Sequence, residues 1–299
     1  FQYKDYSQWL TNKEQQEKLE KQGKFWLKQF QGGIPRLKLL TDSPRPARLS
    51  FEGSALDFDI SGEQTRALKE LALVREATLF MVLLAVYFIL LSRLSGQEDI
   101  IVGTGVSGRE HADLMKIIGL MFNTIPLRNR VEKEKSFLEW LKDLKMSTIE
   151  AFQNQDYPFD QLVENLVNRK LLIRDPSRNP LFDTMFAMQN FRENIDFLSE
   201  LRTLGLKVKP YEYDTRVSRF DLFLYGTEIK DFIRMRLEYS SALFKESTAQ
   251  RIKNYYMKIL SQVLENQEIR IKDITIGTSS THIDLKPEVN QNEYLDFAL

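Results

Sequence analysis

Histidine is the residue most often used as a general base in enzymes, and this chain of 299 residues contains two. His111 lies in the segment GREHADL, and His282 lies in the polar stretch near the C-terminus. Neither has a cysteine, histidine or carboxylate partner at the spacing of a metal site. We therefore expect no metal site, and we assign neither histidine to catalysis.

Other common catalytic patterns are also missing from the sequence. The segment GTGVSG, with Gly103, Gly105 and Gly108, follows a predicted strand but precedes no good helix, so its match to a dinucleotide-binding loop is weak. No serine lies in a GxSxG elbow. The chain has no cysteine, which excludes disulfides, thiolate nucleophiles and cysteine-ligated metals. The residues alone predict no self-sufficient enzyme.

What remains are polar residues in apolar surroundings. Asn123 and Thr124 lie inside the predicted strand LMFNTIPLR. A polar pair there either satisfies a neighbouring backbone or faces a cavity. Asp156 and Tyr157 precede Pro158 at a loop-to-helix corner, which is either a turn that defines the fold or part of a site.

A second polar group lies in the loop before the next predicted strand. Its members are Arg174, Asp175, Arg178 and Asn179. Arginine and aspartate at this density usually lock a loop by paired hydrogen bonds, so a structural role competes with a functional one.

Composition and charge narrow the classes of function. Lys plus Arg and Asp plus Glu each number 42, so the formal net charge is zero and nothing favours nucleic acid or an acidic membrane surface. The longest apolar run, residues 79–91, is shorter than the roughly 20 residues of a membrane-spanning helix. The first residue is Phe1 and no apolar signal segment follows, so we expect a cut or internally started chain.

Helix starts are marked by capping residues. Ser61 with Gln64 and Ser136 with Glu139 form capping boxes, and Thr78 precedes a nearly all-apolar helix. Further helices are predicted at residues 11–30, after Pro158 and at 247–266, and strands at 100–106, 120–128, 181–189, 220–225, 232–239 and 270–276. The order predicts an α/β fold, a mixed sheet covered by helices.

Five segments in order carry a family resemblance. They are YKDYSQWL (3–10), GQEDIIVGTGVSGR (96–109), IGLMFNTIPLR (118–128), NQDYPFD (154–160) and RDPSRNPLFDTMFAMQN (174–190). Together with TDSPRP at 41–46, they resemble the C-terminal half of a condensation domain of nonribosomal peptide synthetases. The chain departs from the family pattern at Leu10, Met121, Phe122, Asn154 and Asp160.

The resemblance implies a chloramphenicol acetyltransferase-like fold, in which two α/β lobes form a V around a tunnel. The family's catalytic HHxxxDG motif lies in the first lobe and is absent here. Residues 1–46 would then be an inter-lobe helix and linker, 47–276 the C-terminal lobe, and 277–299 a tail. Crossover elements are expected at 190–217 (the latch) and loosely within 103–117 (the floor).

The same resemblance implies roles for the polar residues. Asn123, Thr124, Ser218 and Asp221 would line or adjoin the substrate tunnel, whereas Asp156, Tyr157, Arg174, Asp175, Arg178 and Asn179 would form structural motif loops. No catalytic residue and no bound cofactor is expected, because substrates arrive on the phosphopantetheine of carrier domains.

Expected partners are peptidyl carrier domains, the N-terminal lobe and an adenylation domain, in the cytoplasm, with neither nucleic acid nor membrane. An exposed inter-lobe surface would favour self-association.

The sequence leaves several alternative functions open. The chain would be half of an amide-forming domain, inactive alone, or a non-catalytic module that recruits a carrier or partner protein. Epimerisation domains share the fold, but their later segments are not evident. Heterocyclisation domains differ in the region of residues 174–190. An unrelated acyl-CoA transferase would need an HxxxD motif, and the string at His111 has the wrong spacing.

Overall fold

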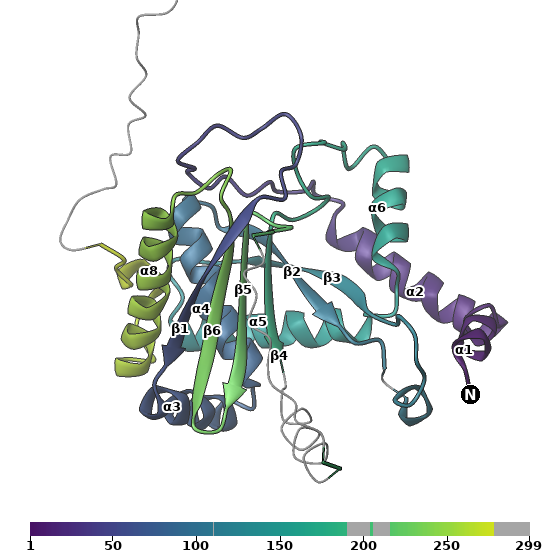
Figure 1. The fold of residues 1–299 in the computed structure, drawn as a ribbon, viewed down its shortest axis with the longest axis horizontal. Helices are drawn as coiled ribbons and strands as arrows, with labels where there is room; N and C mark the ends of the chain where they lie inside the picture. Colours follow the sequence, from purple (N-terminus) through teal and green to yellow (C-terminus); the bar gives the residue numbers. More distant parts are fainter. Residues whose placement is uncertain (110, 190–203, 206–215, 278–299) are drawn as a thin grey trace, which may run out of the picture.

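The computed structural model describes residues 1–109, 111–189, 204–205 and 216–277. Its centre is a six-stranded mixed sheet in the order β1-β6-β5-β4-β2-β3 (Figure 1). The strands are β1 (Gly53–Ile60), β2 (Asp99–Val106), β3 (Asn123–Arg130), β4 (Thr184–Gln189), β5 (Leu222–Ile229) and β6 (Phe232–Ser240). β4 runs parallel to both β2 and β5, and the remaining neighbours are antiparallel. The predicted α/β class is confirmed.

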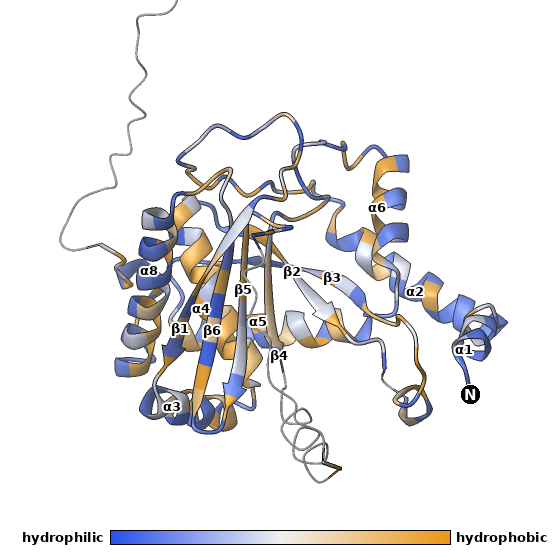
Figure 2. Ribbon diagram, in the orientation of Figure 1, coloured by the Kyte–Doolittle hydropathy of each residue, from blue (hydrophilic) through white to orange (hydrophobic). Residues whose placement is uncertain are grey.

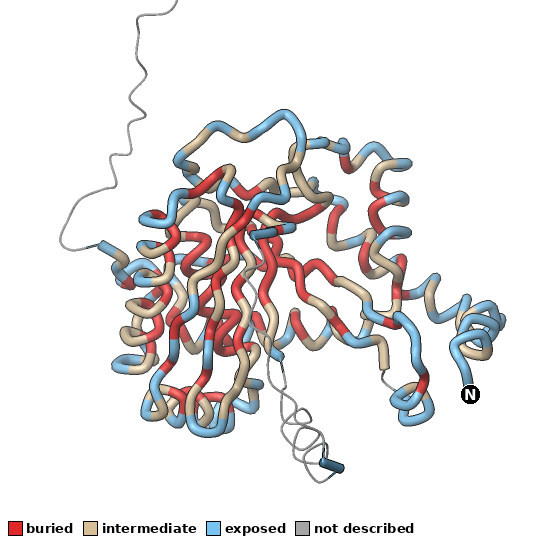
Figure 3. Tube along the Cα trace, in the orientation of Figure 1, coloured by how far each residue is buried: buried red, intermediate tan, exposed pale blue. Residues whose placement is uncertain are grey.

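Four helices lie behind the sheet in Figure 1: α3 (Gly62–Val74), α4 (Leu79–Ser95), α5 (Phe137–Gln153) and α8 (Glu246–Glu265). The helix α4 is central, since every residue from Met81 to Ser92 is buried (Figure 3). Thr78 accepts a hydrogen bond from the backbone of Met81 and caps its start, and Gly96 ends it in a left-handed conformation. The capping boxes of Ser61 and Ser136 are also formed, as predicted.

Apolar side chains join the helices to the sheet. Figure 2 shows hydrophobic residues on the strands and on the helices that pack against them. Tyr256 of α8 contacts Phe58 of β1, with ring centroids 6.3 Å apart. On α4, Phe80 lies 5.4 Å from Phe186 of β4. Within the described residues no single helix is long and apolar enough to cross a bilayer, and the α3–α4 pair, which passes that test when joined, bends by 104°.

The opposite side of the sheet, which we call the open face, faces the viewer in Figure 1. On β6 the predicted alternation is confirmed: Ile233 and Met235 are buried, whereas Arg234 and Arg236 point to the open face. Register pairs these arginines with Asp59 and Asp57 of β1.

At the β3 end of the sheet lie α1 (Tyr3–Leu10), α2 (Lys13–Gln29) and α6 (Phe159–Asn168). The linker after α2 crosses the top of the sheet to reach β1 (Figure 1). Trp26, Phe30 and Leu37 belong to the same hydrophobic core as the sheet, so this N-terminal part packs into one body with the sheet and its helices.

One predicted strand is wrong. Residues 270–276 contain a short 3-10 helix, Ile271–Asp273, and Arg270 forms a single bridge with Ser136. Ile271 and Ile274 are both buried, a spacing that suits this turn better than an alternating strand.

The expected latch at 190–217 falls almost wholly outside the described residues, as does the tail from 278. Part of the expected floor segment is strand β2, and its crossover role stays a prediction.

Candidate functional site

The Asn123 side chain holds the corner between α5 and α6. Its Nδ2 donates to the carbonyl oxygens of Gln155 at 2.7 Å and Tyr157 at 2.9 Å. Its Oδ1 accepts from the backbone N–H of Phe159 at 3.2 Å. Of the two roles open to this residue, the structure shows the first, since its amide satisfies a neighbouring backbone.

The corner also receives helix α2. The indole N–H of Trp26 donates to the carbonyl of Asn154 at 2.8 Å. Asp156 accepts from Gln22 at 3.2 Å and forms an ion pair with Lys18 at 2.7 Å. The segment NQDYPFD thus provides the surface on which α2 docks.

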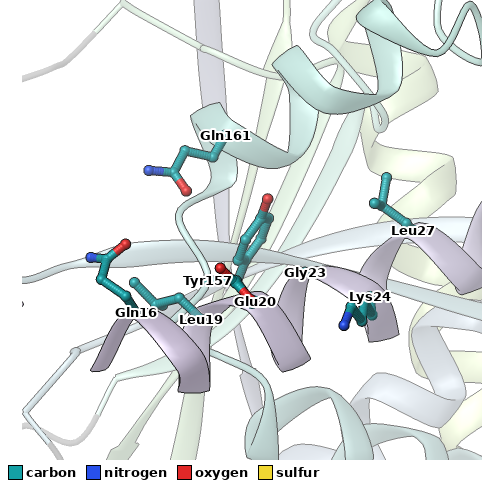
Figure 4. A pocket seen from close by; sticks show the side chains of 8 residues that line it. All are labelled: Gln16, Leu19, Glu20, Gly23, Lys24, Leu27, Tyr157 and Gln161. Carbon is teal, nitrogen blue, oxygen red and sulfur yellow. The ribbon is translucent and has the colours of Figure 1, made fainter. Parts of the chain in front are cut away.

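Tyr157 forms part of a surface groove between α2 and α6 (Figure 4). The ring fits against Gly23, where an added Cβ would lie 2.8 Å from it, and its hydroxyl accepts from Asn165 at 2.8 Å. The groove has a volume of about 280 Å³ and is lined by Gln16, Leu19, Glu20, Gly23, Lys24, Leu27, Tyr157 and Gln161.

A second cluster combines two arginines with two buried aspartates at the start of β4 and β5. Arg45 of the linker forms a bidentate ion pair with Asp221, in which Nη1 lies 3.0 Å from Oδ1. Arg178 pairs with Asp183 and also donates to the carbonyl of Leu37 at 3.3 Å. Asp221 and Asp183 are 3% and 5% exposed. The cluster ties the linker and the loop before β4 to the sheet.

Burial and the nearby charge of Asp221 raise the pKa of Asp183 to about 6, against the opposing effect of Arg178 and Arg45. Its Oδ1 is buried and has no hydrogen-bond partner among the described residues. A carboxylate desolvated in this way favours its neutral form.

Asp175 and Asn179, in the loop before β4, form hydrogen bonds near the same cluster. Asp175 accepts from the hydroxyl and the backbone N–H of Ser177, at 2.6 and 2.9 Å, and these bonds lower the pKa of Asp175. Asn179 donates to the carbonyl of Arg219 at 2.7 Å. Arg174 is exposed. The predicted locking of this loop is therefore seen for Asp175, Arg178 and Asn179.

Of the remaining tunnel candidates, Ser218 is buried and donates to the carbonyl of Phe220 at 2.7 Å. Thr124 lies on β3 opposite Gly105, on the open face. The roles of Asn123, Thr124, Ser218 and Asp221 at a substrate tunnel stay predictions.

The two predicted groups lie near each other but are distinct. Phe159, which follows the Asn123 corner, contacts Phe182 beside the ion-pair cluster, with ring centroids 5.5 Å apart. His111 belongs to neither group. Its side chain is 74% exposed, and the acidic partner that the structure describes is Asp113 at 3.5 Å. The described residues contain no group of three or more His, Cys, Asp or Glu side chains that could hold a metal. His282 lies outside them.

Sequence reasoning missed a pair on the open face. The Tyr225 hydroxyl of β5 donates to Glu238 Oε1 of β6 at 3.2 Å. Burial raises the pKa of Tyr225 to about 12 and also raises the pKa of Glu238. The alternation of residues 232–239 marked this face as polar, but the register that joins Glu238 to β5 was needed to find the pair.

Comparison with known proteins identifies the family. Residues 1–285 match the family model described as Condensation domain, so the chain belongs to the condensation-domain family. It is 42% identical to bacitracin synthase 3 of Bacillus licheniformis, over 91% of this chain and 4% of that protein. It is also 42% identical to gramicidin S synthase 2 of Aneurinibacillus migulanus, over 92% of this chain and 6% of that one.

Solved structures agree with the fold. A four-domain nonribosomal peptide synthetase bound to AMP and glycine superposes with a TM-score of 0.77 at 22% identity, covering 89% of this chain and 21% of that one. The X-domain from teicoplanin biosynthesis superposes with a TM-score of 0.74 at 23% identity, covering 86% of this chain and 57% of that one. This chain spans only a small part of the length of the curated relatives that it matches.

We predict that Asn123→Ala lowers the free energy of unfolding by about 3 kcal/mol, because two carbonyls and one N–H lose their partner. Chemical denaturation measures this. Asn168→Ala, an exposed change at the end of α6, is the matched control and should have little effect. Equal effects of the two changes would contradict the role given to Asn123.

We predict that Asp183 makes stability depend on pH. Its folded pKa of about 6 exceeds the unfolded value, so its contribution is complete below about pH 4 and is lost as the pH rises through 6. The stability of Asp183→Asn relative to the unmodified chain should therefore rise by about 2 to 3 kcal/mol between pH 4 and pH 7. Denaturant titrations across this range measure the difference, with exposed Asp160→Asn as control. A difference that does not change with pH would refute the prediction.

Proposed function

We propose that this chain is the C-terminal lobe of a condensation domain and contributes to amide-bond formation between thioesters held on the phosphopantetheine arms of carrier domains. The chain covers 57% of the X-domain structure and 59% of the condensation domain of the polyketide synthase MokA, although it matches both over most of its own length. These shares support a missing portion of about the size of a second lobe.

The lobe acts as scaffold and tunnel wall, and it leaves the proton transfer to its partner lobe. The exposed position of His111 supports this division, because a general base must reach the proton that it removes. Asn123 and the two arginine–aspartate pairs are engaged in holding backbone and loops. The chain alone is therefore inactive.

An exposed apolar patch supports contact with the second lobe. Its residues come from two segments that meet where the Tyr3 ring lies against Gly119, and the exposed apolar residues of these segments are Phe1, Tyr3, Trp9, Met115, Ile118, Leu120 and Phe122. The patch is held in place, since the Tyr3 hydroxyl donates to the Leu120 carbonyl at 2.9 Å and Arg109 donates to the Gly119 carbonyl at 3.0 Å. In the absence of that lobe, we expect this patch to drive self-association of the chain.

Partners of the complete protein follow from the same proposal. The relatives that contain a region similar to this chain are synthases many times its length, which supports carrier and adenylation domains as neighbours. No cofactor is proposed for the chain itself, and its placement in the cytoplasm stays a prediction.

The proposal predicts that amide formation appears when the first lobe is supplied. The chain alone, and the chain joined to the first lobe of a condensation domain, are each given donor and acceptor carriers, and dipeptidyl-carrier is measured by mass spectrometry. We expect product with the joined protein and none with the chain alone or with a variant of the HHxxxDG motif.

Two outcomes would overturn this view. Product formed by the chain alone would show a catalytic group of its own. If the joined protein has an intact HHxxxDG motif and binds the carriers but forms no product, this would favour the alternative that the chain is a non-catalytic module that recruits a carrier or partner protein.

A further inference from the structure

One row of residues crosses the open face from edge to edge. The register places in this row Ala55, Glu238, Phe223, Met185, Gly103 and Pro126. Glu238 is the single ionisable member, and both its cross-strand neighbours, Ala55 and Phe223, are apolar. A carboxylate in this setting calls for an explanation.

The charged residues next to Glu238 on β6 show the ordinary arrangement. Arg234 lies directly opposite Asp59, and Arg236 directly opposite Asp57, with contacts of 3.1 and 3.3 Å. Such cross-strand pairs stabilise a solvated sheet face. Glu238 has no cation directly opposite, and its ion pair is instead with Arg236 of its own strand, at the longer distance of 4.0 Å.

The surroundings of Glu238 are half-buried. Its side chain is 22% exposed, and Oε1 accepts from the Tyr225 hydroxyl at 3.2 Å and lies 4.0 Å from Arg236 Nε. That Nε is buried and has no hydrogen-bond partner among the described residues. Burial is the main cause that raises the pKa of Glu238. The carboxylate would gain from a further cationic or N–H donor.

Aromatic rings lead away from this pair. The Tyr225 ring lies 5.0 Å from Phe223, which lies 6.1 Å from Phe220, and Phe220 stacks on Phe182 at 6.0 Å. Phe182 in turn covers Gly103. An apolar surface therefore begins directly beside a half-buried acceptor of N–H groups.

We propose that Tyr225 and Glu238 bind the free amino group of an acceptor aminoacyl substrate whose apolar side chain lies along Phe223 and Phe220. Charge selects the occupant: Arg236 reaches Glu238 only at 4.0 Å, whereas the neighbouring ladder pairs make contacts of 3.1 and 3.3 Å, so the carboxylate can still accept from an amine. The rings select a large apolar side chain over a small one. This inference deepens the proposed function and rests on it, since an acceptor with a free amine is what amide formation consumes.

The test uses the chain itself and three stable probes. They are phenylalanine N-butylamide, its deaminated analogue 3-phenylpropionic N-butylamide, and alanine N-butylamide, with binding measured by NMR titration at pH 7. We expect the first to bind about tenfold more tightly than either of the others, a difference of the size of one charge-assisted contact or one aromatic contact.

Variants assign the preference to the pair. Glu238→Gln should remove the preference for the amine, and Tyr225→Phe should reduce it about threefold. Asp59→Asn, on the same face but in the ordinary ladder, is the control and should leave it unchanged. Equal binding of the amine and its deaminated analogue by the unmodified chain would overturn the proposal without any variant, as would an intact preference in Glu238→Gln.

The outcome is separable from that of the proposed function. In the joined protein, Glu238→Gln should raise the KM for the acceptor carrier with a smaller change in kcat. An amine preference in the chain combined with no dipeptide from the joined protein would refute the function while retaining the site. Dipeptide formation with an unchanged KM in Glu238→Gln would refute the site while retaining the function.

Discussion

Three hydrogen bonds from one amide side chain hold the corner on which the helices at the β3 end of the sheet dock. Asn123 starts β3 and holds the backbone from Gln155 to Phe159. That corner presents the Asn154 carbonyl and Asp156 to helix α2, so the position of α2, and of α1 before it, depends on a residue far away in the sequence. A carboxamide suits the task because it donates twice and accepts once.

The arginine–aspartate cluster performs the corresponding task at the opposite strand ends. Its four members come from the linker, the loop before β4 and the start of β5. The Arg45–Asp221 pair joins segments distant in sequence, whereas Arg178 and Asp183 belong to the same loop before β4. Removing one partner of such a buried pair leaves an uncompensated charge, which is costly. Residues of the family motifs therefore hold backbone and loops in place through Asn123 and the two arginine–aspartate pairs, and their roles at a tunnel stay predictions. The polar pair of Tyr225 and Glu238 lies outside these motifs.

Local features were predictable from the sequence and distant ones were not. Capping at Ser61, Thr78 and Ser136 depends on residues three positions apart, and alternation in β6 depends on neighbours, so both were predicted correctly. The loop-locking role of Arg178 followed from its density of charge, but its partner Asp183 did not. The choice between roles for Asn123 required knowing that residues 155–159 lie beside it. The strand predicted at 270–276 failed because apolar residues at i and i+3 also suit a short helical turn.

The strand order has a consequence for how the protein is made. β1 is an early strand, yet among the described strands it pairs only with β6, whose last residue is Ser240. At a synthesis rate of about 5 to 20 residues per second, β1 and the apolar helix α4 leave the ribosome many seconds before the strand that completes their side of the sheet. During that interval the future interior of the fold is on the outside of a growing chain.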